Sequence, residues 1–211
     1  MKYYIGIDLG GTNIVAGVVN ENYEIVSKAS TKTNLPRSGE EIAADMSAMS
    51  EQAVKEAGIT MNDVEWIGVG TPGSVNAEEG VVQYSNNLGF KNTPLAKYIN
   101  AKLNKKVFVE NDANAAAYGE YVAGAAKGAK TAVCITLGTG VGGGIIIDGK
   151  IYSGANYAAG EIGHTVLDVN GPMCTCGRRG CFEVFSSATG LIRMTKEAMD
   201  KDPKSIMHEI T

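Results

Sequence analysis

Apolar residues recur in short runs along the chain, separated by glycine turns, polar loops and stretches with helical spacing. Apolar runs over residues 3–8 and 14–19 lie on either side of a turn that contains Gly10, Gly11 and Thr12. This pattern predicts two strands joined by a glycine turn. A dinucleotide-binding fingerprint requires a helix after its glycines, and no helical pattern follows this turn. Bare backbone N–H groups in such a turn can nevertheless bind phosphate.

A similar arrangement occurs again in the second half of the chain. Residues 132–137 are predicted to form a strand, residues 138–144 a glycine-rich turn and residues 145–147 the return strand. Asp148 and Gly149 mark the next hairpin turn. Two such units are consistent with an internal duplication that produces two related lobes. They are also consistent with two unrelated hairpins in one α/β protein, and the repeat alone leaves both possibilities open.

Helical patterns and buried strands alternate between these two units, as they do in α/β folds. Ile42, Met46, Met49 and Ala53 lie on one face of a predicted helix that ends at Gly58. Further helices are predicted over residues 94–103, 113–121 and 186–199, and buried strands over residues 66–70 and 107–109.

Four turns follow the ends of predicted strands. Asp8, the turn at residues 71–73, Asp112 and the turn that begins at Gly138 all hold this position. Ligands of open α/β sheets gather at the carboxyl ends of the strands. We therefore expect the four turns to line one cleft.

The pattern divides the chain into two predicted lobes. Residues 1–122 form the first, which holds the first glycine turn and Asp112, and residues 123–211 form the second, which holds the second glycine turn and a cysteine-rich loop. No third strand–helix repeat follows the helical run over residues 186–199. We therefore expect the second lobe to be incomplete relative to a two-lobed parent, with apolar surface left exposed on its sheet.

Composition narrows the class of protein. The chain has 211 residues, a formal net charge of -4 and 44% hydrophobic residues, which is typical of a globular protein with a large core. Mild acidity argues against a nucleic-acid binder, which normally carries a basic stripe. The apolar runs are too short to cross a bilayer, and no signal peptide is visible. We therefore expect a cytoplasmic protein without nucleic-acid or membrane partners.

Three of the four cysteines lie in one short loop. Cys174, Cys176 and Cys181 are separated by glycine and polar residues, and such a cluster suggests metal chemistry in a reducing compartment. Structural zinc sites readily combine three cysteines with one histidine. His164 is the candidate fourth ligand, since the other histidine, His208, lies in a distant polar stretch. The alternative is a chance cluster of free thiols.

Asp112 is the candidate general base. It follows a predicted strand and could accept a proton from an alcohol that attacks a phosphoryl group. An aspartate before an alanine-rich run is also an excellent helix N-cap, so both interpretations stay open. Glu161 and Glu183 are either ligands or solvated surface charges. Asp8 either ends a strand or holds a metal through water, and Asn87 either forms a turn or recognises hydroxyl groups.

Several of these segments resemble one known family. Asp8–Thr12 resembles the first phosphate loop of the actin–hexokinase superfamily, and Leu137–Gly144 resembles the second. Glu110–Ala115 is similar to the catalytic segment of the ROK family of sugar kinases. Glu161–His164 and the Cys174–Glu183 loop resemble its signature and zinc site, which is the most specific of these motifs. The resemblance implies an actin/hexokinase-like (ribonuclease H-like) duplicated α/β fold.

The resemblance also implies a role for each motif. Asp112 would be the catalytic base on the sugar 6-hydroxyl, and His164 would contact zinc through one ring nitrogen and sugar through the other. Zinc would organise the pocket without taking part in the chemistry. Sugar hydroxyl groups would be bound by Asn87, Asn111, Asp112, Glu161, His164 and Glu183, with Gly73 lining the pocket. ATP phosphates would be held by Gly10, Gly11, Thr12, Gly138, Thr139 and Gly140, with magnesium near Asp8.

The implied activity is ATP-dependent phosphorylation of a hexose. Residues 71–74 and 87–90 look most like the glucokinase branch, which implies glucose as substrate, phosphorylated at its 6-hydroxyl in glycolysis. A kinase for N-acetylmannosamine, N-acetylglucosamine or fructose is the alternative within the family. A non-catalytic sugar-binding module is the alternative from another class.

Two further expectations concern the ends of the chain. ROK repressors carry a helix-turn-helix before this core, and the first strand here starts at residue 3, which disfavours a repressor. The family's adenine-binding segments lie beyond residue 211, so we expect the chain to bind sugar but catalyse poorly. The full-length parent is expected to be a homodimer.

Overall fold

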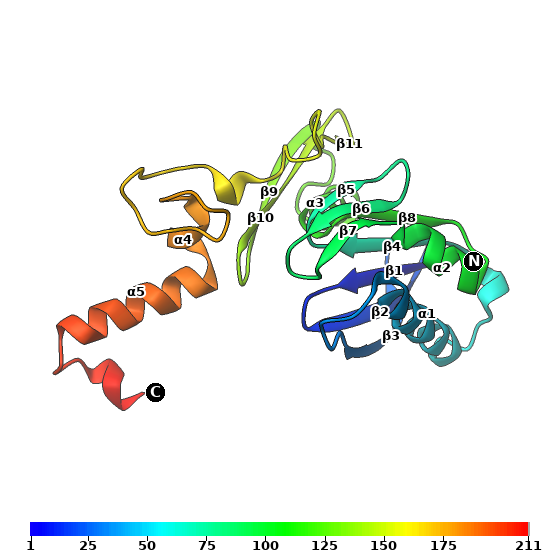
Figure 1. Ribbon diagram of the computed structural model, residues 1–211. Coiled ribbons are helices and arrows are strands. Elements are labelled where there is room, and N and C mark those ends of the chain that lie inside the picture. Colours follow the sequence, from blue (N-terminus) through cyan, green and yellow to red (C-terminus); the bar gives the residue numbers. More distant parts are fainter. Residues whose placement is uncertain (211) are drawn as a thin grey trace.

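The computed structural model describes residues 1–210 and shows a mixed α/β fold with three sheets (Figure 1). The largest sheet has five strands in the order β3-β2-β1-β4-β8. They are β1 (Tyr3–Leu9), β2 (Asn13–Asn20), β3 (Ile25–Lys32), β4 (Val64–Thr71) and β8 (Val107–Asn111). β1, β2 and β3 pair antiparallel, whereas β1, β4 and β8 pair parallel. The first glycine turn therefore joins two antiparallel strands, as predicted.

Helices cover this sheet on both faces. α1 (Gly39–Glu56) and α2 (Leu95–Leu103) pack on the face that buries Ile5, Ile7 and Leu9 of β1. α3 (Asp112–Ala123) packs on the opposite face, where Ala115 lies against Gly70 of β4. All members of the main hydrophobic core come from residues 5–109, so the first predicted lobe carries most of the buried apolar surface.

Local signals explain where α1 begins and ends. The Ser38 side chain accepts a hydrogen bond from the Glu41 backbone, and Glu41 Oε2 accepts one from the Ser38 backbone at 2.8 Å, which forms a capping box. Gly58 follows the helix with a φ of 70°, a left-handed conformation that glycine adopts without strain. The helix end predicted at Gly58 is therefore confirmed.

The remaining strands form two smaller sheets. A second sheet has the order β5-β6-β7 and a third the order β11-β10-β9. The strands are β5 (Ser74–Asn76), β6 (Val81–Ser85), β7 (Phe90–Thr93), β9 (Thr131–Leu137), β10 (Val141–Ile147) and β11 (Lys150–Ile151). The helices are η1 (Met61–Asp63), η2 (Ile162–His164), α4 (Phe182–Ser186), α5 (Ala188–Lys201) and η3 (Ile206–Glu209).

The second glycine-rich segment differs from the prediction. The turn occupies only the residues between β9 and β10, and Gly142, Gly143 and Gly144 belong to β10. A Cβ atom at Gly144 would lie 2.4 Å from the Ala117 Cβ, and one at Gly142 would lie 2.8 Å from the Ala113 Cβ. These two glycines let α3 pack closely against the strand. The hairpin turn predicted at residues 148–149 is confirmed, with positive φ at both positions.

Other boundaries also shift. The predicted run over residues 186–199 contains a break, because Ser187 is extended and caps α5 by accepting a hydrogen bond from Gly190 N. Pro94 is the N-cap of α2, so the helix begins one residue later than predicted. Trp66 lies in a strand as predicted but is 40% exposed, and its ring packs against those of Tyr4 and Phe108.

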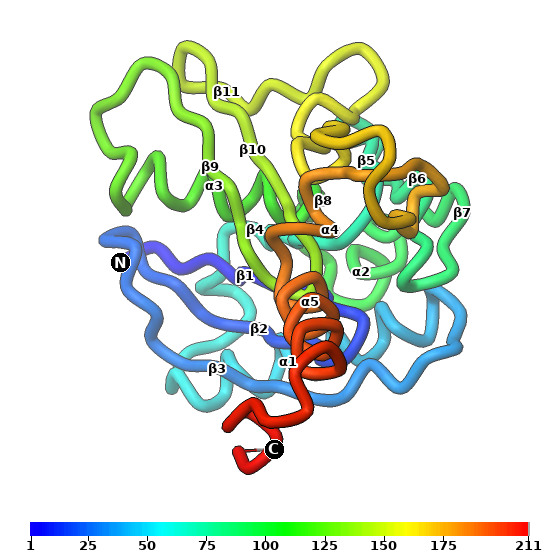
Figure 2. The backbone as a smooth tube through the Cα atoms, turned by 90° about the vertical axis from the view of Figure 1, so that its left-hand side faces the viewer, coloured from blue at the N-terminus to red at the C-terminus, as the bar shows by residue number. Residues whose placement is uncertain are grey.

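The third sheet is covered on one face by α3. Val133, Ile135 and Leu137 of its edge strand β9 are largely exposed, which agrees with the expected exposed apolar surface. α5 extends to one side in Figure 1 and points toward the viewer in Figure 2. The predicted lobe boundary near residue 122 falls at the end of α3, and it stays a prediction. No helix within residues 1–210 is long and apolar enough to cross a membrane.

Candidate active site and metal cluster

Turns from both halves of the chain surround one cavity of about 1290 Å³. Its walls come from the ends of β4 and β8, the loops around residues 84–87 and 157–165, the turn between β9 and β10, and part of the cysteine loop. Eleven of the predicted site residues line it: Gly73, Asn87, Asn111, Asp112, Gly138, Thr139, Gly140, Glu161, His164, Cys176 and Glu183. The predicted cleft therefore contains the candidate base, every candidate sugar ligand and the second glycine turn.

Asp112 lies at the first position of α3, directly after β8. The N-cap is Asn111, whose Oδ1 accepts hydrogen bonds from Ala113 N at 3.0 Å and Asn114 N at 3.1 Å. The alternative interpretation of Asp112 as the cap is therefore wrong, because its neighbour holds that position. Asp112 Oδ1 accepts from Ala113 N at 2.9 Å, and a negative charge at a helix N terminus is favourable.

Gly73 fixes the shape of the wall opposite Asn111. Its φ is 108°, and a Cβ atom there would lie 2.2 Å from the Tyr84 carbonyl oxygen. Only glycine fits such a close approach. The Gly73 carbonyl oxygen accepts a hydrogen bond from Asn111 Nδ2 at 3.1 Å. Asn111 therefore ties the turn after β4 to the start of α3.

The first glycine turn lies beside the cavity, not in its wall. Asp8, Gly10, Gly11 and Thr12 do not line it, although a Cβ atom at Gly11 would lie 4.0 Å from the Asn87 Cβ. Partial burial raises the pKa of the Asp8 carboxyl group, and the nearby Asp112 charge raises it further. Two carboxylates that repel each other this way favour a cation between or beside them.

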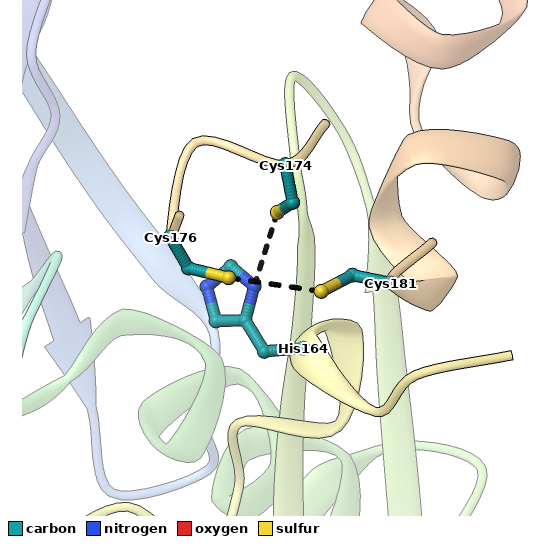
Figure 3. A group of neighbouring side chains, drawn as sticks. All are labelled: His164, Cys174, Cys176 and Cys181. Atoms are coloured by element: carbon teal, nitrogen blue, oxygen red, sulfur yellow. Dashed lines mark hydrogen bonds between the residues drawn. The ribbon is translucent and has the colours of Figure 1, made fainter. Parts of the chain in front are cut away.

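The four predicted metal ligands lie together (Figure 3). Their ligand atoms are all within 4.8 Å of one another. His164 Nδ1 lies 3.6 Å from Cys174 Sγ, and Cys176 Sγ lies 3.6 Å from Cys181 Sγ. Zn–S bonds of about 2.3 Å in a tetrahedron separate sulfur atoms by about 3.8 Å. The donor set and spacing thus fit a tetrahedral zinc ion.

The histidine ring connects this cluster to the cavity. Nδ1 points toward Cys174, while Nε2 lies 3.7 Å from Glu161 Oε2. Both His164 and Glu161 line the cavity. The two ring nitrogens therefore face different partners, and the double role implied for this histidine stays a prediction.

The thiols of the cluster differ in acidity. Burial opposes ionisation of Cys176, but hydrogen bonds from the Arg178 backbone and side chain and from Cys174 and Cys181 outweigh it, and its pKa falls to about 6. Burial, followed by the neighbouring Cys176 and Cys174, raises the pKa of Cys181 to about 11. Zinc binds thiolates, so at neutral pH Cys181 would release a proton on binding.

Sequence reasoning gave no role to two residues behind the candidate base. Glu110 Oε1 accepts hydrogen bonds from Asn111 N at 2.8 Å and from Asn114 Nδ2 at 3.0 Å. Asn114 is only 5% exposed and lines the cavity. Together they fix the segment that carries Asp112. Glu110 lies in β8 and Asn114 in the first turn of α3, so no single periodicity joins them, and their closeness along the chain was the signal available in the sequence.

Comparison with known proteins identifies the class of this fold. Glucokinase from Thermotoga maritima is 38% identical over 98% of this chain, which spans only 64% of that relative's length. The crystal structure of a ROK family glucokinase from Streptomyces griseus, in complex with glucose and AMPPNP, superposes with a TM-score of 0.82. It is 39% identical, with 96% of this chain and 62% of that chain covered. A xylose repressor from Caldicellulosiruptor bescii is 34% identical over 92% of this chain and 48% of its own length.

The predicted actin/hexokinase-like α/β fold is therefore confirmed. The model of the ROK family matches residues 4–210, and the chain belongs to the ROK family. The relatives include sugar kinases and repressors, so membership alone does not fix the activity.

Proposed function

We propose that this chain forms the sugar-binding and phosphoryl-transfer site of an ATP-dependent hexose kinase that phosphorylates glucose at its 6-hydroxyl group. The observation that carries this proposal is the shared cavity, which is lined by Asp112, the turn at Gly138 and His164 of the histidine–cysteine cluster. The glucokinase names of two relatives support the choice of sugar. Because the chain spans about 64% of a curated relative's length, the activity proposed is that of the whole protein.

Asp112 would act as general base. One of its oxygens is held by Ala113 N, so Oδ2 would accept the proton as the sugar oxygen bonds to the γ-phosphorus of ATP, the bond from that phosphorus to the bridging oxygen breaks and ADP leaves. A negative charge at a helix N terminus is favourable, so the start of α3 suits a carboxylate at this position. General-base catalysis contributes roughly 10²–10⁴-fold to rate, and the rest of the acceleration comes from positioning.

The two glycine turns would hold the phosphates through backbone N–H groups. Asp8 fits a magnesium ion, because a carboxylate oxygen is the ligand that this ion prefers and because a cation would relieve the repulsion from Asp112. When bound, magnesium supplies positive charge that neutralises the transferring phosphoryl group.

Cys174, Cys176, Cys181 and His164 would hold zinc in a closed site with four protein ligands. Zinc in such a site supplies structural stability and leaves no open position for a substrate. The ligands would fix the His164 ring so that Nε2 faces Glu161 and the cavity. Sugar recognition would then fall to His164 and Glu161 together with Asn87, Asn111 and Glu183.

A panel of hexoses tests the proposal. Glucose, fructose and N-acetylmannosamine are supplied with ATP and magnesium, and ADP formation is followed in a coupled assay. Glucose is expected to give the highest kcat/KM, because a site built around specific hydroxyl groups is left with unpaired polar groups by other sugars. Equal efficiency for all three sugars would contradict glucose specificity, and no ADP with any sugar would contradict the kinase assignment.

A sugar-binding module without catalysis is the second candidate. The likeness to a repressor of the same family favours it. Calorimetric binding of glucose without ADP formation, in the chain and in a longer parent alike, would support this alternative. The expected homodimer of the parent and the cytoplasmic location stay predictions, and sedimentation of the parent tests the first.

A further inference from the structure

Glu183 links the metal cluster to the glycine turn between β9 and β10. It is the second residue of α4, whose N-cap is the metal-cluster residue Cys181. Its Oε2 accepts a hydrogen bond from Val141 N at 3.0 Å across 42 residues of sequence. A Cβ atom at Gly140 would lie 2.4 Å from this same oxygen. The carboxylate therefore occupies the space that a side chain on the turn would need.

Two more hydrogen bonds hold the same turn against the start of α5. The Gly138 carbonyl oxygen accepts from Ala188 N at 2.9 Å, and the Thr139 carbonyl oxygen accepts from Thr189 Oγ1 at 2.8 Å. Carbonyl oxygens repel a phosphate, so their engagement by α5 keeps them from turning toward one. Together with Glu183, these contacts form a three-bond clamp on the turn, made by Glu183, Ala188 and Thr189.

The clamp is in contact with the segments that carry the candidate metal ligands. Phe182 N donates to the Thr165 carbonyl oxygen at 2.8 Å, which joins α4 to the segment after His164. Cys174 Sγ lies 3.8 Å from Glu183 Oε1. A metal ion that binds Cys181 and His164 would thus fix the N-terminal end of α4, which carries Glu183.

We propose that Glu183 is a positioning residue through which the metal cluster orders the glycine turn that binds phosphate. The inference rests on the proposed kinase function for the identity of the ligand at the turn, but the coupling itself concerns only this chain. It adds a nucleotide-side role to a residue otherwise expected to bind sugar. Metal loss would then weaken phosphate binding and not only the sugar pocket.

Amide hydrogen exchange at Val141, followed by NMR on the zinc-loaded chain, tests the coupling without reference to activity. Glu183→Ala removes the acceptor and should speed exchange of the Val141 amide at least about tenfold, since hydrogen bonds to charged groups are among the stronger ones. Glu183→Gln keeps an acceptor oxygen, so its Val141 exchange rate should stay within about threefold of that in the unsubstituted chain. Glu197→Ala is the matched control, because this exposed glutamate of α5 forms its ion pair with Arg193.

Removal of zinc by a chelator is the second experiment. Removing zinc from the unsubstituted chain should speed Val141 exchange to a similar extent. Zinc removal should speed exchange little further in Glu183→Ala, because the two perturbations act through one contact. The Ile146 amide, in the buried part of β10, reports whether the strand itself unfolds. If Glu183→Ala also frees Ile146, then Thr189→Val, which removes the bonds of Thr189 Oγ1 to the Thr139 carbonyl oxygen and to Ser187 Oγ, replaces it in the comparison.

The outcomes separate this proposal from the proposed function. Unchanged Val141 exchange after confirmed zinc loss overturns the coupling, whatever the kinase assay gives. Faster Val141 exchange after zinc loss would support the coupling even if the full-length protein forms no ADP. That absence of ADP would contradict the kinase proposal alone. In an active parent, Glu183→Ala should raise the KM for ATP at least about tenfold, and Glu183→Gln should restore most of it. A change confined to the KM for sugar would leave Glu183 a sugar ligand only.

Discussion

The close contact between α3 and β10 makes Gly144→Ala a sharp test of the fold around the site. The new Cβ would lie 2.4 Å from the Ala117 Cβ and 2.8 Å from the Ala113 carbonyl oxygen. One of these atoms is backbone, so the helix or the strand must shift. Overpacking of this kind costs about 1–3 kcal/mol. For a chain of this size each kcal/mol lowers Tm by about 2–4 °C, so we expect a fall of about 2–12 °C in a thermal melt.

Gly119→Ala is the matched control on the same helix. Gly119 is exposed in the middle of α3, and a Cβ there meets nothing within 4 Å. The same chemical change should therefore stabilise the protein, by about 0.5–1 kcal/mol, through helix propensity alone. A loss of stability in Gly144→Ala together with a gain in Gly119→Ala would separate the effect of packing from that of helix propensity.

Ala117→Gly completes the cycle. It removes the atom nearest the new Cβ, so the double variant with Gly144→Ala should lose less stability than the sum of the two single losses. A Gly144→Ala protein that melts at or above the parent temperature would refute the close α3–β10 packing. Strict additivity in the double variant would place the strain elsewhere.

Three further predictions concern the site chemistry. Asp112→Asn should lower kcat of an active parent roughly 10²–10⁴-fold while calorimetry still detects sugar binding; a fall of less than tenfold would leave Asp112 without a catalytic role. Cys176→Ala should reduce zinc below one ion per chain by elemental analysis and lower both Tm and sugar affinity, and full zinc with an unchanged melt would argue against the cluster. Asp8→Asn should raise Tm at pH 7. The raised pKa of Asp8 means that the folded state holds this proton more tightly than the unfolded state. Its stabilising contribution is therefore present at low pH and lost as pH rises through the folded pKa, so the gain in Tm should vanish in acid, and a pH-independent gain would contradict it.

Periodicity located most elements because their signals are local. The strands on either side of Gly10 alternate buried and open positions, and α1 carries its own capping box and terminal glycine. The cysteine spacing also pointed to the metal cluster before any fold was known. In each case the deciding residues lie within one turn or one strand of each other.

The predictions failed where distant residues decide the outcome. Gly142 and Gly144 have the composition of a turn, but contact with α3 some thirty residues earlier draws them into β10. The choice between Asn111 and Asp112 as helix cap depends on the extended backbone of Asn111 at the end of β8. The bond from Val141 N to Glu183 joins residues that lie 42 positions apart within the second predicted lobe, and no local pattern connects them.

The exposed edge strand β9 has a consequence for handling the chain. It reads TAVCITL, without charge, proline or glycine, and its outward side chains Val133 and Ile135 are 58% and 48% exposed. It has a paired neighbour, β10, on one side only. A seven-residue, β-prone, uncharged edge is the composition that seeds cross-β stacking. We expect the isolated 211-residue chain to form fibrils or precipitate as its concentration rises, and a lysine at position 133 to act as a gatekeeper that keeps it dispersed.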